Sequence, residues 1–97
     1  MNDEYINVKR EKAVLCMNEF VQNVYPDECF EFVVNVDPDG NPYDTTPPGE
    51  IDTVGLFRDG ALVFLCHAWN TSPAKLLVRL ARMLKHTIGK AGKNDRM

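Results

Sequence analysis

The sequence predicts an α+β fold in the order α-β-β-β-α, with a three-stranded antiparallel sheet and two flanking helices. Apolar residues recur with helical spacing near both ends of the chain, whereas residues 28–36, 51–58 and 61–69 are short apolar runs typical of strands. Asp59-Gly60 joins the last two runs. Asp-Gly between apolar runs is the strongest short-range signal of a β-hairpin, so these observations together define the fold class.

Residues 5–24 are predicted to form the first helix, because their apolar side chains fall on one face at about 100° per residue. The helix is expected to end at Tyr25-Pro26, since the residue before a proline is forced out of the helical region. The predicted apolar face consists of Ile6, Ala13, Val14, Met17, Phe20, Val21 and Val24.

Residues 28–36 are predicted to form the first strand, because apolar side chains alternate along them. The following segment, residues 37–49, is dense in proline, glycine and aspartate. That composition predicts a long loop. The side chains expected on one face of the strand are Phe30, Phe32, Val34 and Val36.

The hairpin turn also predicts how the second and third strands pair. A two-residue turn at Asp59-Gly60 places Asp52 opposite His67. Both faces of the hairpin are then apolar in the middle, so the sheet must be covered twice. Either one helix lies on each face, or both helices share one face and a second copy of the chain covers the other; we favour the second arrangement. The face expected to be open carries Asp52, Val54, Leu56, Val63, Leu65 and His67.

Residues 73–88 are predicted to form the second helix, with Ser72 as its N-cap and Gly89 just after its end. The polar tail from about residue 90 is expected to be flexible. The whole chain, residues 1–97, is then a single domain. The apolar stripe of this helix consists of Leu76, Leu77, Leu80, Met83, Leu84 and Ile88.

The composition predicts a protein of the cytoplasm, or of the host cytoplasm if a virus encodes it. The chain is 44% hydrophobic and 26% charged, which is typical of a soluble domain. No apolar run approaches the ~20 residues that span a bilayer, so no membrane partner is expected. Cys16, Cys29 and Cys66 form neither a zinc pattern nor a disulfide framework. We therefore expect no metal and no cofactor.

Charge is divided unevenly between the two parts of the chain. Residues 1–59 hold four bases against thirteen acids, a net charge of −9, and residues 60–97 hold seven bases against one acid, a net charge of +6. Such asymmetry indicates a charged partner. A basic stripe on the second helix could contact an acidic protein surface, follow the phosphates of a nucleic acid, or simply face solvent. The stripe consists of Lys75, Arg79, Arg82 and His86.

Two further candidate sites lie beside the third strand. In one interpretation, the Asp52 carboxylate fixes which nitrogen of His67 carries the proton, as in the catalytic sets of small enzymes. In the other, Asp52 and His67 form only an ion pair at the end of the sheet. The nucleophile is missing, because Cys66 points to the opposite face of the strand from His67. Trp69 either closes one end of the core or offers an exposed platform to a partner.

These observations predict a small non-enzymatic binding or regulatory protein that acts through protein–protein interaction. The expected partner is another protein, a second copy of the chain in a homodimer, or both. A phage-type inhibitor of a host factor fits the small size and the divided charge. The two alternatives are a nucleic-acid-binding protein that uses the basic face of the C-terminal helix and a small enzyme that uses His67 with Asp52.

Overall fold

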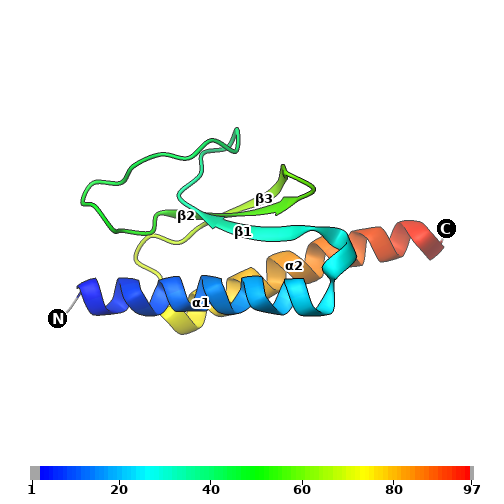
Figure 1. Cartoon of the computed structure of the whole chain (residues 1–97), viewed down its shortest axis with the longest axis horizontal. Coiled ribbons are helices and arrows are strands. Elements are labelled where there is room, and N and C mark those ends of the chain that lie inside the picture. The colour runs from blue at the N-terminus through cyan, green and yellow to red at the C-terminus, as the bar shows by residue number, and fades with distance from the viewer. Residues whose placement is uncertain (1–2, 97) are drawn as a thin grey trace.

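The predicted α+β order is confirmed by the structure, a computed structural model that describes residues 3–96, with side chains described for residues 6–89 (Figure 1). The three strands form one antiparallel sheet in the order β1-β2-β3. The elements are α1 (Asp3–Val24), a 3₁₀ turn η1 (Pro26–Glu28), β1 (Phe30–Val34), β2 (Thr53–Arg58), β3 (Ala61–His67) and α2 (Pro73–Arg96).

Both helices lie on the same face of the sheet and run side by side in the same direction (Figure 1). Of the two arrangements that the sequence allows, the structure has the one with a two-helix layer. A single core fills the space between this layer and the sheet. The homodimer expected to cover the other face stays a prediction. The core consists of Val14, Met17, Val21, Phe30, Phe32, Ile51, Val54, Leu56, Ala68, Leu76, Leu80, Met83 and Leu84.

The loop after β1 covers part of the second face of the sheet. Asn35 has a φ of +57°, a conformation that asparagine tolerates. This bend turns Val36 away from the face predicted for it, so that it packs beside Gly55 and Leu62 instead. The hydroxyl of Thr53 fixes the bend, because it accepts from the Val36 amide at 3.0 Å and donates to the Val36 carbonyl at 2.8 Å. This chain therefore covers some of the surface that we assigned to a second copy.

A β-bulge at Val63 changes the register that the hairpin turn predicts. Near the turn the register is as expected, but Phe57 pairs with Leu62 and Leu56 pairs with Phe64, so Val63 has no partner. Beyond the bulge every pair is shifted by one residue, and Thr53 instead of Asp52 lies opposite His67. A one-residue shift moves side chains to the other face. The open face predicted from the sequence is therefore wrong, because its β2 residues Val54 and Leu56 are in the core while His67 is exposed.

Side chains from the helices occupy both edges of the sheet. On β1, the Asn18 amide accepts from the Phe32 backbone N–H at 2.7 Å and donates to the Phe32 carbonyl at 3.0 Å, which replaces a neighbouring strand. On β3, the Arg79 guanidinium donates to the His67 carbonyl at 2.8 Å. Unpaired edges are templates for aggregation, and bulges and charged side chains are the usual protection. The sheet is thus a poor site for the addition of another strand.

Helix α2 continues to Arg96, so the prediction that it ends before Gly89 is wrong. The tail that we predicted to be flexible from residue 90 begins inside this helix, and its side chains lie outside the described ones. Gly89 does not have the positive φ that a helix-ending glycine adopts. The helix passes through it because nothing in the local packing requires the chain to turn.

Replacing Gly89 with alanine should stabilise the protein by about 0.5–1 kcal/mol, because glycine inside a helix is less favourable than alanine by that amount. A Cβ added at Gly89 meets no atom within 4 Å, so no clash offsets the gain. Urea unfolding followed by circular dichroism would measure the change. A loss of stability would mean that Gly89 ends the helix, as the sequence pattern had indicated.

Candidate functional site

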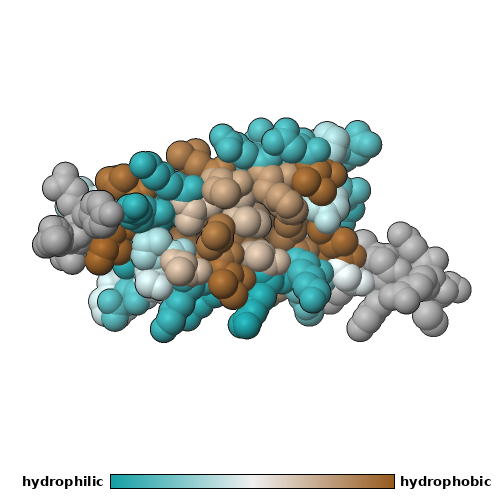
Figure 2. All heavy atoms as spheres, turned by 90° about the horizontal axis from the view of Figure 1, so that it is seen from below, coloured by the Kyte–Doolittle hydropathy of each residue, from teal (hydrophilic) through white to brown (hydrophobic). Residues whose placement is uncertain are grey.

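The outer side of the helix layer, which faces away from the sheet, carries an apolar band along its length. Figure 2 shows brown and tan atoms in the middle of this side and teal atoms along both long edges. At one end of the band the two helices border a hollow of about 480 Å³. We call it the α1–α2 groove; it is lined by Met17, Phe20, Tyr25, Ala81, Leu84, Lys85, Ile88 and Gly89.

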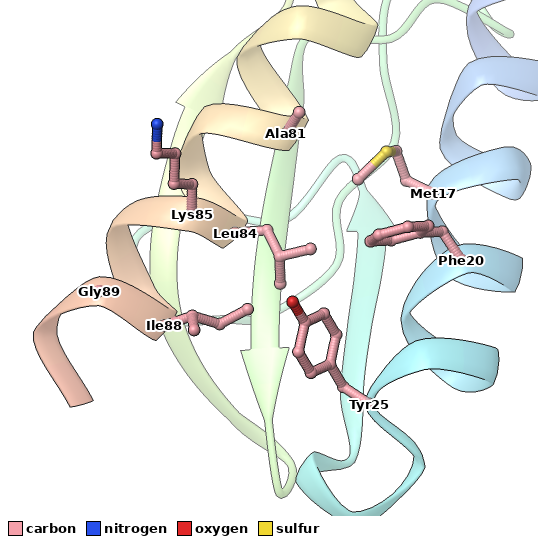
Figure 3. Close-up of a pocket in the computed structure, with 8 residues that line it drawn as sticks. All are labelled: Met17, Phe20, Tyr25, Ala81, Leu84, Lys85, Ile88 and Gly89. Atoms are coloured by element: carbon pink, nitrogen blue, oxygen red, sulfur yellow. The ribbon is translucent and has the colours of Figure 1, made fainter. Parts of the chain in front are cut away.

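The groove exists because the apolar stripe of α1 is wider than the core requires. Met17 and Leu84 are buried and form the floor. Phe20 comes from the same stripe, but its side chain is 45% exposed and forms one wall (Figure 3). Ala81 and Ile88 form the opposite wall from α2. An amphipathic stripe that faces only a core leaves no such wall, so this part of the stripe has an exposed side that packing does not explain.

Tyr25 closes one end of the groove and links it to the core. Its ring makes edge-to-face contacts with Phe20 on one side and Phe30 on the other, each with 6.2 Å between ring centroids. Its hydroxyl points into the hollow toward Leu84 and Ile88 (Figure 3). Within the described part of the chain this hydroxyl has no hydrogen-bond partner. The groove therefore presents one polar group on an otherwise apolar surface.

Three cations lie on the exposed side of α2, and one of them, Lys85, lines the groove. Between Pro73 and Gly89 the chain contains no carboxylate. Lys75, Arg82 and Lys85 are all exposed, and the Lys85 ammonium points away from the hollow (Figure 3). We call these three residues the α2 ridge. Its charge is not balanced by any acid on the same helical segment, so it favours a negatively charged neighbour.

The basic stripe predicted on α2 is divided by the structure. Lys75 and Arg82 belong to the outward ridge, but Arg79 also donates to the Thr71 hydroxyl at 3.1 Å, in addition to its bond to β3. The His86 ring lies edge-to-face on Phe64, with centroids 5.8 Å apart. Arg79 and His86 therefore attach α2 to β3. A second, smaller hollow of about 340 Å³ between α2 and β3 is lined by both residues and also by Arg82.

The Asp52–His67 pair is not formed, which corrects the prediction from the hairpin register. The extra residue at Val63 shifts Thr53 opposite His67, and the Asp52 carbonyl instead accepts from the Ala68 amide at 2.7 Å. A carboxylate that orients an imidazole must lie within hydrogen-bond reach of it. The residues needed for the enzymatic alternative are thus not brought together.

Two of the three cysteines, at different places in the fold, have a raised pKa. Burial raises the pKa of the Cys66 thiol, and the Arg79 guanidinium acts in the opposite direction with a smaller effect. A hydrogen bond and the negative charge of Asp59 raise the pKa of Cys29. The thiolate is the nucleophilic form of cysteine. Neither environment favours that form.

Trp69 is 68% exposed, so it does not close the end of the core. It lies beside Ile6 at the start of α1, where the two residues line a hollow of about 230 Å³ together with Arg10 and Glu50. Exposed tryptophan is common at binding hot spots. A partner could reach Trp69 at this exposure, but its use by a partner stays a prediction.

Arg10 is a residue of structural importance that the pattern analysis missed. It is only 6% exposed, and its Nε donates to the Thr71 carbonyl at 2.7 Å. Its Nη1 donates to Asn7 and lies 3.7 Å from a Glu50 carboxylate oxygen. The signal was its spacing, because Arg10 lies four residues before Val14 and falls in the middle of the apolar stripe. A charged residue at such a position needs buried partners.

No family model, curated protein or solved structure matches the chain. In the part of the chain that the structure describes, no three His, Cys, Asp or Glu side chains are grouped so as to hold a metal ion. Neither described helix has the combination of length and apolar character that crossing a bilayer requires.

Proposed function

We propose that this protein is a small binding protein that acts through protein–protein interaction, with the outer side of the helix layer as its docking surface. The observation that carries the proposal is the apolar α1–α2 groove beside the cationic α2 ridge. Protein interfaces combine an apolar, well-packed centre with a polar rim. Exposed apolar residues that no core requires mark such surfaces, and Phe20, Leu77 and Val78 are of this kind.

In this proposal the two parts of the surface have different tasks. Burial of the groove supplies most of the affinity, because it removes apolar area from water. The α2 ridge supplies specificity and a fast approach of an acidic partner. A docking surface with these two parts is sufficient for a regulatory or inhibitory protein, including a phage-type inhibitor of a host factor. We place it in the cytoplasm, where the free thiols of Cys16, Cys29 and Cys66 are usual.

Retention of a partner from a cell lysate tests the proposal when groove variants are compared with a matched control. The bait is the full chain, and the lysate is treated with nuclease so that nucleic acid cannot bridge. Phe20→Asp and Ala81→Glu place a carboxylate in the groove and should abolish retention. Leu15→Asp alters an apolar residue that is 62% exposed and about 140° away around α1, so it should retain the partner.

Two results would contradict the docking proposal. Equal retention by the wild type and both groove variants would exclude the groove as the interface. Retention that occurs only when the nuclease is omitted would favour the nucleic-acid alternative, for which the carboxylate-free segment of α2 is the supporting feature. In that case binding of duplex or single-stranded fragments should weaken steeply with salt, and Arg82→Gln should reduce the slope.

A further inference from the structure

We infer that the occupant of the α1–α2 groove is an amphipathic helix of a partner protein, with acidic residues along the flank that faces the α2 ridge. The inference rests on the proposed function and adds the chemistry of the partner. Its apolar side would contact the floor formed by Met17 and Leu84 and the walls formed by Phe20, Ala81 and Ile88. This is the helix-in-groove mode of recognition.

A helix fits this surface because it satisfies its own backbone. The groove is built from α1 and α2, whose backbone N–H and C=O groups are bonded within each helix. It offers no row of free backbone donors and acceptors to an extended segment. An extended partner would therefore bury unpaired amides against Met17 and Leu84, at a cost that apolar contact does not recover. A helix brings only side chains to the groove.

The geometry of the helix layer also favours a third helix. Two helices packed side by side leave a furrow between them, and a further helix can rest its ridges in it. The apolar band follows the direction of α1 and α2 (Figures 1 and 2). The hollow occupies one end of the band, where Phe20 and Ile88 face each other (Figure 3). The extension of the apolar band along the helices matches the apolar stripe of an amphipathic helix.

The charge on α2 favours a foreign helix over a second copy packed with α2 against α2. Lys85 lines the groove, Lys75 and Arg82 lie on the exposed side of the same helix, and the segment that carries them has no acid. Two copies packed groove to groove with α2 on α2 would bring their cationic ridges together, and like charges across an interface are unfavourable. A helix with glutamate or aspartate on its flank would instead complement the ridge.

Tyr25 gives the occupant a polar contact. Its hydroxyl points into the hollow and has no partner among the described residues. A side chain or exposed carbonyl of the bound helix can accept a hydrogen bond there. Such a bond would fix the register of the helix along the groove, since the other contacts are apolar and non-directional.

Selection from displayed peptide libraries tests the inference with the full chain as bait. One library consists of peptides of about five helical turns, roughly 18 residues. Their apolar positions have helical spacing and vary among Leu, Ile, Met and Phe, and their flanking positions vary between Glu and Lys. A second library has the same composition with apolar residues at every other position, as in a strand. Clones that also bind Phe20→Asp are removed.

We expect the groove-dependent clones to have helical spacing and glutamate on one flank. Ala81→Glu should weaken a selected peptide by about tenfold to a hundredfold, because it buries an unpaired carboxylate. Tyr25→Phe, which removes only the hydroxyl, should weaken it by about twofold to tenfold. Leu15→Asp should leave the affinity unchanged. Unfolding curves of each variant establish that a loss of binding is not a loss of fold.

Each other outcome overturns the inference. Groove-dependent clones with alternating spacing or lysine flanks, or the absence of groove-dependent clones in both libraries, would reject the acidic helix. If retention from the lysate still depended on the groove, the groove would remain the docking surface, but its occupant would not be an acidic helix. Self-association that is lost in Phe20→Asp, measured by analytical ultracentrifugation, would identify a second copy as the occupant. Equal retention from the lysate by the wild type and the groove variants would reject the docking proposal itself.

Discussion

Replacing Arg10 with methionine should destabilise the protein by about 2–4 kcal/mol, because the buried carbonyl of Thr71 loses its donor and Glu50 loses a nearby cation. Methionine preserves most of the length and apolar contact of the arginine side chain. The loss is therefore one of charge and hydrogen bonds, not of volume. A domain of this size has about 5–15 kcal/mol of stability in total, so the change would be a large fraction of it.

The two interactions of Arg10 contribute unequally. The Nε–Thr71 carbonyl bond is short, at 2.7 Å, and Arg10 is almost fully buried. The contact with Glu50 is longer, at 3.7 Å, and the glutamate side chain is 19% exposed. Glu50→Gln should therefore cost no more than about 1 kcal/mol, as is usual for a partly solvated ion pair. Together the two substitutions separate the contribution of the Thr71 hydrogen bond from that of the ion pair with Glu50, which lies in the loop before β2.

Urea unfolding of both single variants and of the double variant measures these contributions as a double-mutant cycle. If Arg10→Met cost no more than Glu50→Gln, the ion pair would be the main interaction, and the Nε–Thr71 bond would contribute little. Arg10→Lys is a useful comparison. Lysine keeps the charge but cannot place a second N–H on Asn7 in the same fork geometry, so it should recover only part of the loss.

The periodic features of the sequence were sufficient to predict the elements and their order. The stripe from Val14 to Val21, the Asp59-Gly60 turn and the leucines of α2 each repeat a simple spacing. Helical and strand periods follow from backbone geometry alone. Because these periods reflect only backbone geometry, they do not predict how wide an apolar stripe the core needs. That Phe20 lies outside the core could be found only after the two helices were placed side by side.

Single-residue irregularities account for the features that were predicted incorrectly. The bulge at Val63 and the positive φ of Asn35 each depend on tertiary packing, whereas Gly89 continues the helix without the positive φ that would end it. Turn chemistry determines strand register only as far as the first bulge, and a shift by one residue moves every later side chain to the other face. The Asp52–His67 site was lost for this reason. It depended on the register at the end of the hairpin that is farthest from the turn.

Deleting Val63 should leave the fold intact, because Val63 is the one residue of β3 that has no partner in β2. In the deleted chain Leu62 would be followed directly by Phe64. Their side chains already point to opposite faces, since Leu62 lies beside Gly55 while Phe64 contacts His86. The alternation of a regular strand would thus be restored without moving either residue. Cooperative urea unfolding and a wild-type near-ultraviolet spectrum would confirm this.

Deleting Gly55 from the facing strand should instead strongly destabilise the protein. Strand alternation would turn Val54, which is fully buried, to the outer face and bring Thr53 toward the core. Loss of the valine costs about 1.5–3 kcal/mol, and burial of an unpaired hydroxyl costs about 1–3 kcal/mol more. No bulge in β3 can compensate, because the faces of β2 are set by its own alternation. If both deletions lowered the free energy of unfolding equally, the bulge would be a requirement of the fold, and Val63 would have a role beyond spacing.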